Sequence, residues 1–174
     1  MSTKSVQQDP GAFARAILDS NLYMTLGTVD EDGRPWISPV YYATDDHTDF
    51  YWTSSSEATH SRNIATRPQV SIVVFDSQVP AYTGQAVYMS AVAEELAGTD
   101  LDRGLAVYPG PAERGASAVT AEQLRPPSVI RLYRARVSQT LDPLPEELRA
   151  AVSRARSRLR PSDPRDSLAG RPVG

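Results

Sequence analysis

Four consecutive hydroxyl residues, Thr53–Ser56, stand directly before a segment that carries His60 and Arg62. The pattern predicts a helix over residues 55–66, and a helix start needs only one capping hydroxyl. A helix N-terminus carries partial positive charge and free N–H donors, so the surplus hydroxyls indicate a site for an anion such as a phosphate. His60 lies one turn after Ser56, and helical side chains lean toward the N-terminus, so its imidazole is expected to reach that anion. The alternative is a capped surface helix with both basic side chains in solvent.

Local signals bound this helix. Ser54 and Glu57 have the S-x-x-E spacing of a capping box. Pro68 disfavours helical backbone at the residue before it, so the helix should end there. Arg62 lies on a different face from His60, and it must use its long side chain to reach back to the helix start.

A second place where a ligand could meet the chain is Pro39, in the middle of an expected strand at Trp36–Thr44. Proline cannot donate to a ladder, so it marks an edge strand or a bulge. Such a break leaves backbone groups of Ser38 and Val40 free to contact a ligand. An edge strand protected against aggregation explains the same residue equally well.

Aromatic residues concentrate on the strands around these positions, and they are Trp36, Tyr41, Tyr42, Tyr51 and Trp52. Such surroundings bind flat ring systems well, although ordinary core filling is the better explanation for most of them.

The segment Asp45–Asp49 places three carboxylates around His47. A metal site is one interpretation. An Asp-rich turn is favoured, because Asp suits turns and the chain has only 2 histidines. No metal site and no acid–base or nucleophile motif is predicted, so catalytic residues stay unassigned.

The rest of the chain alternates short strands with turns and a few helices. Strands are expected over residues 22–29, 36–44, 49–54, 69–76, 85–96 and 127–141. In the first of these, alternation predicts that Leu22, Met24 and Leu26 point one way and that Tyr23 and Thr25 point the other. Helices are expected over residues 9–21 with Asp9 as cap, from Thr99 or Asp100 onward, and for a turn or two at 120–125. Gly33 suits a turn with positive φ. Six strands joined by hairpin turns favour a mainly β fold with peripheral helices, as a small antiparallel barrel, with a β-sandwich as the structural rival.

Composition indicates one folded domain over residues 1–141, followed by a Pro- and Arg-rich tail, 142–174, that is expected to be partly disordered. The net charge of −3 implies no strong field for nucleic acid. The absence of cysteine excludes disulfides, thiolate metal sites and a Cys nucleophile. No apolar segment suits a signal peptide or a membrane helix, so we expect a soluble cytoplasmic protein with no membrane partner.

The order of these parts resembles the pyridoxamine 5'-phosphate oxidase-like family of FMN-binding split β-barrels. The likeness rests on the blocks SPVYY, DFYWTSS, HSRNIATRPQVSIVVFD and GQAVYMSAVAEEL, and it covers about Asp19–Leu96 and, more loosely, Pro127–Leu141. It implies a six-stranded antiparallel split β-barrel and a homodimer with FMN at the subunit interface. By this resemblance, the residues that hold the FMN phosphate are Thr53, Ser54, Ser55, Thr59, His60 and Arg62. His60 stands where the family usually has lysine. The residues near the flavin ring are Ser38, Pro39, Val40, Tyr51 and Trp52, and Gln85 corresponds to a flavin-contacting glutamine.

The sequence departs from true pyridoxamine phosphate oxidases at its end, because RPSDPRDSLAGRPVG lacks the tryptophan of their C-terminal segment. The resemblance therefore implies the general branch of the family rather than vitamin B6 oxidation. The expected function is an FMN-dependent oxidoreductase that acts on an unknown small molecule. The alternatives are an F420-dependent reductase on the same fold, with Arg62 and Arg67 near the cofactor tail, and a non-enzymatic flavin- or haem-binding protein.

Overall fold

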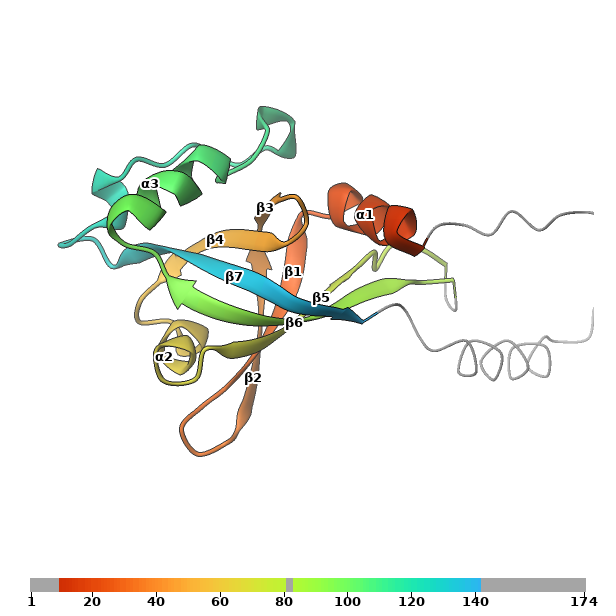
Figure 1. Ribbon diagram of the computed structural model, residues 1–174, viewed down its shortest axis with the longest axis horizontal. Helices are drawn as coiled ribbons and strands as arrows, with labels where there is room; N and C mark the ends of the chain where they lie inside the picture. The colour runs from red at the N-terminus through yellow and green to blue at the C-terminus, as the bar shows by residue number, and fades with distance from the viewer. Residues whose placement is uncertain (1–9, 81–82, 142–174) are drawn as a thin grey trace, which may run out of the picture. The chain divides into compact units, whose positions relative to one another are not determined.

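Across residues 10–80 and 83–141, which are the part of the chain that the structure describes, one sheet of seven antiparallel strands runs in the order β2-β1-β5-β6-β7-β4-β3. Figure 1 shows this computed structural model, with the sheet curled and the helices outside it. The strands are β1 (Tyr23–Val29), β2 (Pro35–Tyr41), β3 (Ala43–Asp45), β4 (Asp49–Ser55), β5 (Gln69–Phe75), β6 (Ala86–Glu95) and β7 (Ile130–Leu141). The helices are α1 (Pro10–Ser20), α2 (Thr59–Thr66) and α3 (Gly98–Val107), with short 3₁₀ turns η1 (Ala112–Arg114) and η2 (Glu122–Leu124). The mainly β fold with peripheral helices is confirmed, and the β-sandwich alternative is wrong.

The two edge strands of the sheet, β2 and β3, follow one another along the chain and are separated only by Tyr42. The predicted strand 36–44 is therefore two strands, so the six predicted strands become seven within the described residues. Tyr42 is fully buried, and its hydroxyl donates to the Leu18 carbonyl at a distance of 2.6 Å. Because the sheet order pairs β2 only with β1, the barrel stays open along one seam, as a split β-barrel does. Pro39 thus lies on an edge strand, as its missing N–H predicted.

Side chains alternate in direction along each strand, and those of one parity fill the inside of the curled sheet. Met24 and Leu26 of β1 share one face, as the alternation predicted, and both are buried, whereas Leu22 precedes the strand and is exposed. Trp52 of β4 and Tyr133 of β7 stack in this core, with ring centroids 5.5 Å apart. The side chains of the opposite parity on β4 and β7 must therefore pack outside the barrel.

Helix α3 covers that outer face, where Tyr51 and Leu132 are buried beneath it (Figure 1). Gly104 permits the close approach, because a Cβ at this position would lie 2.8 Å from Leu132 Cδ2. The start of α3 has no side-chain cap hydrogen bond, so the cap predicted at Thr99 or Asp100 is wrong.

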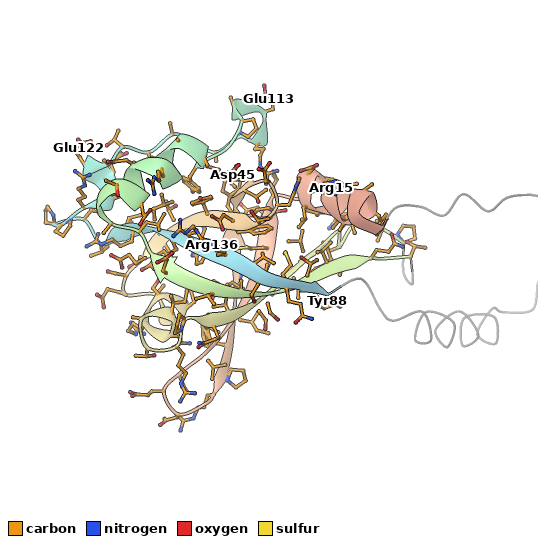
Figure 2. The ribbon with its side chains drawn as sticks, in the orientation of Figure 1. Arg15, Asp45, Tyr88, Glu113, Glu122 and Arg136 are labelled. Atoms are coloured by element: carbon orange, nitrogen blue, oxygen red, sulfur yellow. The ribbon has the colours of Figure 1, made fainter. Side chains whose placement is uncertain are left out.

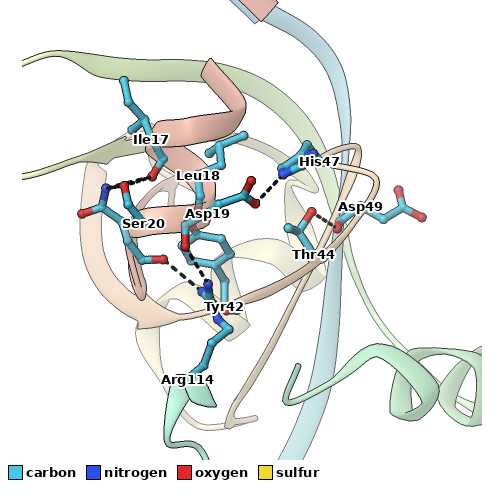
Figure 3. Close-up of polar contacts among 10 residues, drawn as sticks. Ile17, Leu18, Asp19, Ser20, Tyr42, Thr44, His47, Asp49 and Arg114 are labelled. Carbon is cyan, nitrogen blue, oxygen red and sulfur yellow. Dashed lines mark hydrogen bonds and ion pairs between the residues drawn. The ribbon is translucent and has the colours of Figure 1, made fainter. Parts of the chain in front are cut away.

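An arginine from the segment after α3 joins the end of α1 to the edge strands (Figure 3). Arg114 donates to the carbonyls of Asn21 and Tyr42, each at 3.0 Å. Its guanidinium carbon also lies 5.7 Å from the centre of the Tyr41 ring and 5.2 Å from that of the Tyr42 ring. This one side chain therefore fixes the corner at which β2 passes into β3.

The other predicted elements are found with ends moved by a few residues. Gly33 has a φ of 85°, as its turn requires. Strand β7 starts at Ile130 rather than at Pro127, and η2 is a single turn. The cap predicted at Asp9 and the tail predicted at 142–174 lie outside the described residues. Among the helices that the structure describes, none is long and apolar enough to cross a membrane.

Candidate functional site

Four polar side chains form a hydrogen-bonded chain where α2 meets the strands. Trp36 Nε1 donates to Ser38 Oγ, 3.0 Å away on the same strand, β2. Ser38 Oγ lies 3.0 Å from His60 Nδ1, and His60 Nε2 lies 2.8 Å from Ser54 Oγ on β4. The fold therefore brings together three of the predicted site residues, Ser38, Ser54 and His60, from β2, β4 and α2.

His60 is enclosed by this arrangement. Its side chain is buried, and that burial lowers the pKa of His60 below its ordinary value. Both ring nitrogens are already engaged by hydroxyl oxygens. At neutral pH the imidazole is therefore uncharged in the free protein, and it does not supply the positive charge that its position in the sequence suggested.

The hydrogen-bonded chain belongs to a larger polar layer beneath α2, which packs against β1 and β2. Within the described residues, the buried polar side chains are Thr28, Ser38, His60, Ser61 and Asn63. Asn63 Nδ2 donates to Thr28 Oγ1 on β1 at 3.0 Å. Sequence reasoning missed this pair and Ser61. Two signals could have found the pair, because Asn63 follows His60 by one turn on the same helix face and Thr28 continues the inward parity of Met24 and Leu26.

Helix α2 starts later than predicted and lacks the predicted capping box. Its N-cap is Ala58, which makes no side-chain cap hydrogen bond. Ser55 Oγ instead accepts the N–H of Glu57 at 3.1 Å in the turn before the helix. The first helical N–H with a backbone acceptor is that of Arg62, which donates to the Ala58 carbonyl. The N–H groups at positions 59–61 therefore have no hydrogen-bond acceptor among the described residues, and they form an open set of donors.

Arg62 reaches back to this helix start, as the sequence required. Its guanidinium donates to the Glu57 carbonyl, which is a neutral group. No carboxylate in the described part of the chain forms an ion pair with Arg62, and the side chain is exposed. Its positive charge and its remaining donors are therefore available beside the open N–H groups of α2.

The hydroxyl run itself is divided between two faces of β4. Thr53 Oγ1 lies 2.9 Å from the hydroxyl of Tyr108, on the face that α3 covers. Ser54 points to the other face and meets His60. Adjacent residues of a strand face opposite sides, so Thr53 and Ser54 side chains do not converge on one point. Thr59, the first residue of α2, is half-buried at the helix start.

Some of the residues predicted beside a flavin ring have buried side chains, and others are exposed to solvent. Val40, Tyr51 and Trp52 have buried side chains that fill the two cores, so core filling is the correct interpretation for these aromatics and for Tyr42. Pro39 is exposed on the edge strand, and Trp36, which is on the same face of the strand as Ser38, is 49% exposed. A ring at this edge could therefore contact the backbone of β2 and the Trp36 side chain.

Gln85 lies apart from these residues in the described chain. It is exposed and directly precedes β6, whose first residue, Ala86, pairs with Phe75 at the far end of β5. Helix α2 leads into the opposite end of β5, at Gln69. One chain therefore does not bring Gln85 to the polar layer beneath α2.

The Asp-rich segment 45–49 is a turn, as predicted. Asp46 and His47 have positive φ values of 50° and 57°, and His47 Nε2 lies 2.7 Å from Asp19 Oδ1 on α1 (Figure 3). Within residues 10–80 and 83–141, no group of three His, Asp or Glu side chains could hold a metal ion.

Comparisons with known proteins agree with this fold. The family model described as pyridoxamine 5'-phosphate oxidase matches residues 12–141. Among curated proteins, none matches this chain. A haem-binding protein from Mycobacterium smegmatis is similar in structure with 25% identity and a TM-score of 0.60, over 84% of this chain and 62% of that one.

Two further solved structures share the architecture. The haem storage protein HutZ from Vibrio cholerae is 18% identical with a TM-score of 0.56, over 76% of this chain and 93% of that one. A protein named as an F420 reductase is 20% identical with a TM-score of 0.51, over 74% of this chain and 95% of that one. These likenesses show the fold, whereas the family match spans most of the sequence. The chain belongs to the pyridoxamine 5'-phosphate oxidase-like family.

Proposed function

We propose that this protein binds FMN and acts as a flavin-dependent oxidoreductase on a small molecule. The observation that carries the proposal is the start of α2, where N–H donors without acceptors, hydroxyls and an unpaired guanidinium meet at one corner. Such a corner suits the dianionic phosphate of FMN, because a helix N-terminus and a guanidinium both favour negative charge. Membership of a family described by pyridoxamine 5'-phosphate oxidase supports the same choice of cofactor.

The residues that would hold the phosphate are those with open donors. They are Ser55 and Thr59 through their hydroxyls, the backbone N–H groups at positions 59–61, and Arg62 through its charge. Ser54 and His60 lie behind them and are bonded to each other. The ring would lie along the edge strand at the backbone of Ser38, Pro39 and Val40, with the exposed Trp36 side chain on the same face as Ser38.

FMN supplies two-electron chemistry when it is bound, and the protein supplies binding, orientation and electrostatics. The edge strand offers backbone groups that no neighbouring strand uses, because β2 pairs on one side only. The half-exposed indole of Trp36 offers an apolar surface for a conjugated ring. These features orient a flat cofactor, and they require no separate acid–base residue.

The test is reconstitution of the purified chain with FMN, F420 and haem in parallel, followed by removal of free ligand and a visible spectrum. We expect stoichiometric retention of FMN with the two absorption bands of an oxidised flavin. Arg62→Ala should weaken FMN affinity by about tenfold, because it removes a charge-assisted contact to phosphate. The matched control is Arg103→Ala, which removes an exposed arginine of α3. Retention of F420 or haem in place of FMN, or equal FMN affinity for both variants, would contradict the proposal.

A homodimer is part of the same proposal. Several large apolar side chains are exposed on β2, β1, β5 and β6, and they are Tyr23, Ile37, Phe75, Tyr88 and Val92. The ladders place these four strands side by side, and Figure 2 shows Tyr88 at the end of the sheet near α1. An apolar face of this kind favours burial against a second copy.

Light scattering of the eluted protein tests this face directly. We expect the mass of a dimer for the unmodified chain. Ile37→Asp should give a monomer, because it places a charge on the apolar face, whereas Ala118→Asp in the segment after η1 should leave the mass unchanged. A monomeric unmodified chain at micromolar concentration would rule out this part of the proposal.

A further inference from the structure

His60 connects two strands that share no ladder. In the sheet order, β2 stands at one end and β4 next to the other end, so backbone hydrogen bonds do not join them. The imidazole crosses this open seam, with Ser38 of β2 at Nδ1 and Ser54 of β4 at Nε2. A single side chain of α2 therefore joins β2, β4 and the helix.

We propose that His60 is a neutral positioning residue that sets the distance between β2 and β4 at the cofactor corner, and that it is not the cation that binds phosphate. The effect of His60 on FMN binding rests on the proposed function, whereas its hydrogen bonds are properties of the free protein. His60 thereby has a role different from the one that a lysine at the same place would have, since a lysine has donors only.

The donor and the acceptor of each hydrogen bond follow in order from Trp36 through Ser38 and His60 to Ser54. Trp36 Nε1 can only donate, so Ser38 Oγ accepts from it. The Ser38 hydroxyl is buried, and His60 Nδ1 is the acceptor that lies within reach of its hydrogen among the described residues. His60 Nδ1 is then unprotonated, and Nε2 carries the hydrogen and donates it to Ser54 Oγ. A neutral imidazole has one acceptor and one donor, so it satisfies both contacts.

The charged groups on the surrounding elements do not favour an imidazolium. On α2, the charge is that of Arg62, which is itself positive. On β7, Arg131 stands opposite Ser54 in the ladder, and its charge is paired with Glu95 of β6, at 3.1 Å. Asp49 on β4 lies five residues from Ser54 and is paired with Arg136. No carboxylate within the described residues faces the ring, so burial is uncompensated and keeps the pKa of His60 low.

The first experiment reads the ring in the free protein by nitrogen-15 NMR. The chain has only 2 histidines, so His47→Gln assigns the signals and serves as the matched control. We expect His60 to show the tautomer protonated at Nε2 and to stay neutral at pH 7. Ser38→Ala should change the tautomer ratio of His60 without affecting His47. A charged ring at pH 7, or a tautomer protonated at Nδ1, would overturn the inference.

The second experiment measures FMN affinity between pH 6 and 8, which is about the range in which an ordinary histidine titrates. A positioning role predicts that the unmodified chain shows no histidine-dependent step above about pH 6.5, and that His60→Ala and Ser38→Ala each weaken binding by severalfold. It also predicts that His60→Lys weakens binding, because lysine cannot accept from Ser38. Tighter binding by His60→Lys, or an affinity that Ser38→Ala leaves unchanged, would refute it. If the unmodified chain binds no FMN at any pH, the proposed function fails, while the tautomer measurement still decides the role of His60.

Discussion

The contacts of Arg114, where β2 passes into β3, offer the sharpest test of how this barrel is stabilised. The change is Arg114→Ala, which removes hydrogen bonds of 3.0 Å to the carbonyls of Asn21 and Tyr42 and a longer one of 3.4 Å to that of Asp19. It also removes the packing of the guanidinium on two tyrosine rings. Hydrogen bonds from a charged group contribute about 1.5 kcal/mol each at the low end, and a partly exposed cation–π contact adds about 0.5–1 kcal/mol. The two shorter hydrogen bonds and the cation–π contact together predict a loss of about 4 kcal/mol in the free energy of unfolding.

The assay is urea unfolding followed by tryptophan fluorescence, which should change on unfolding because Trp52 is buried in the core. Arg114→Lys keeps the charge but lacks the planar fork, so it should lose about half as much. The matched control is Arg103→Ala, whose exposed ion pair with Asp100 should contribute less than about 0.5 kcal/mol. If Arg114→Ala and Arg103→Ala unfold at the same urea concentration, the contacts drawn in Figure 3 do not hold the corner.

Three further changes probe the cores. Burial raises the pKa of Tyr42 to about 12, so the stability tied to its neutral hydroxyl is present below the ordinary value of 10.0 and is lost as pH rises toward 12. Tyr42→Phe should remove that alkaline loss in unfolding experiments and cost about 1 kcal/mol at neutral pH through the bond to Leu18. Thr28→Val should cost about 1–3 kcal/mol because it leaves the buried Asn63 amide without its acceptor, and a double-mutant cycle with Asn63→Leu should give a coupling energy well above zero. Gly104→Ala should destabilise by about 1 kcal/mol in the same urea assay, because overpacking against β7 exceeds the gain in helix propensity.

Local patterns predicted most of the sheet because their causes are local. Alternation in β1 identified the inward positions of Met24 and Leu26, and a missing N–H placed Pro39 on an edge strand. Gly33 marked a turn by its conformational freedom, and Pro68 marked the end of α2. Each of these residues acts on its own backbone, so neighbours along the sequence were sufficient.

The interruption between β2 and β3 at Tyr42 and the hydrogen bonds around His60 depend on contacts between residues far apart in the sequence. No local sequence pattern predicts such contacts. Tyr42 is fixed by the Leu18 carbonyl, 24 positions away, and by Arg114, 72 positions away. His60 is neutral because the fold encloses it between Ser38 and Ser54. The family resemblance predicted these residues around one cofactor but not their contacts with one another, and burial removes the positive charge expected of the histidine because it lowers its pKa.

The division of the hydroxyl run between two faces of β4 reduces the number of hydroxyl donors that the start of α2 presents to a phosphate. Strand parity commits Thr53 to Tyr108 on one face and Ser54 to His60 on the other, so two of the four hydroxyls serve the fold. Those that remain adjoin the start of α2, where the backbone donors are open and Arg62 holds an uncompensated charge. Under the proposed function, positive charge at the corner comes from the helix terminus and Arg62, while His60 contributes geometry. In this chain the charge and the positioning therefore belong to separate residues, and each can be changed without the other.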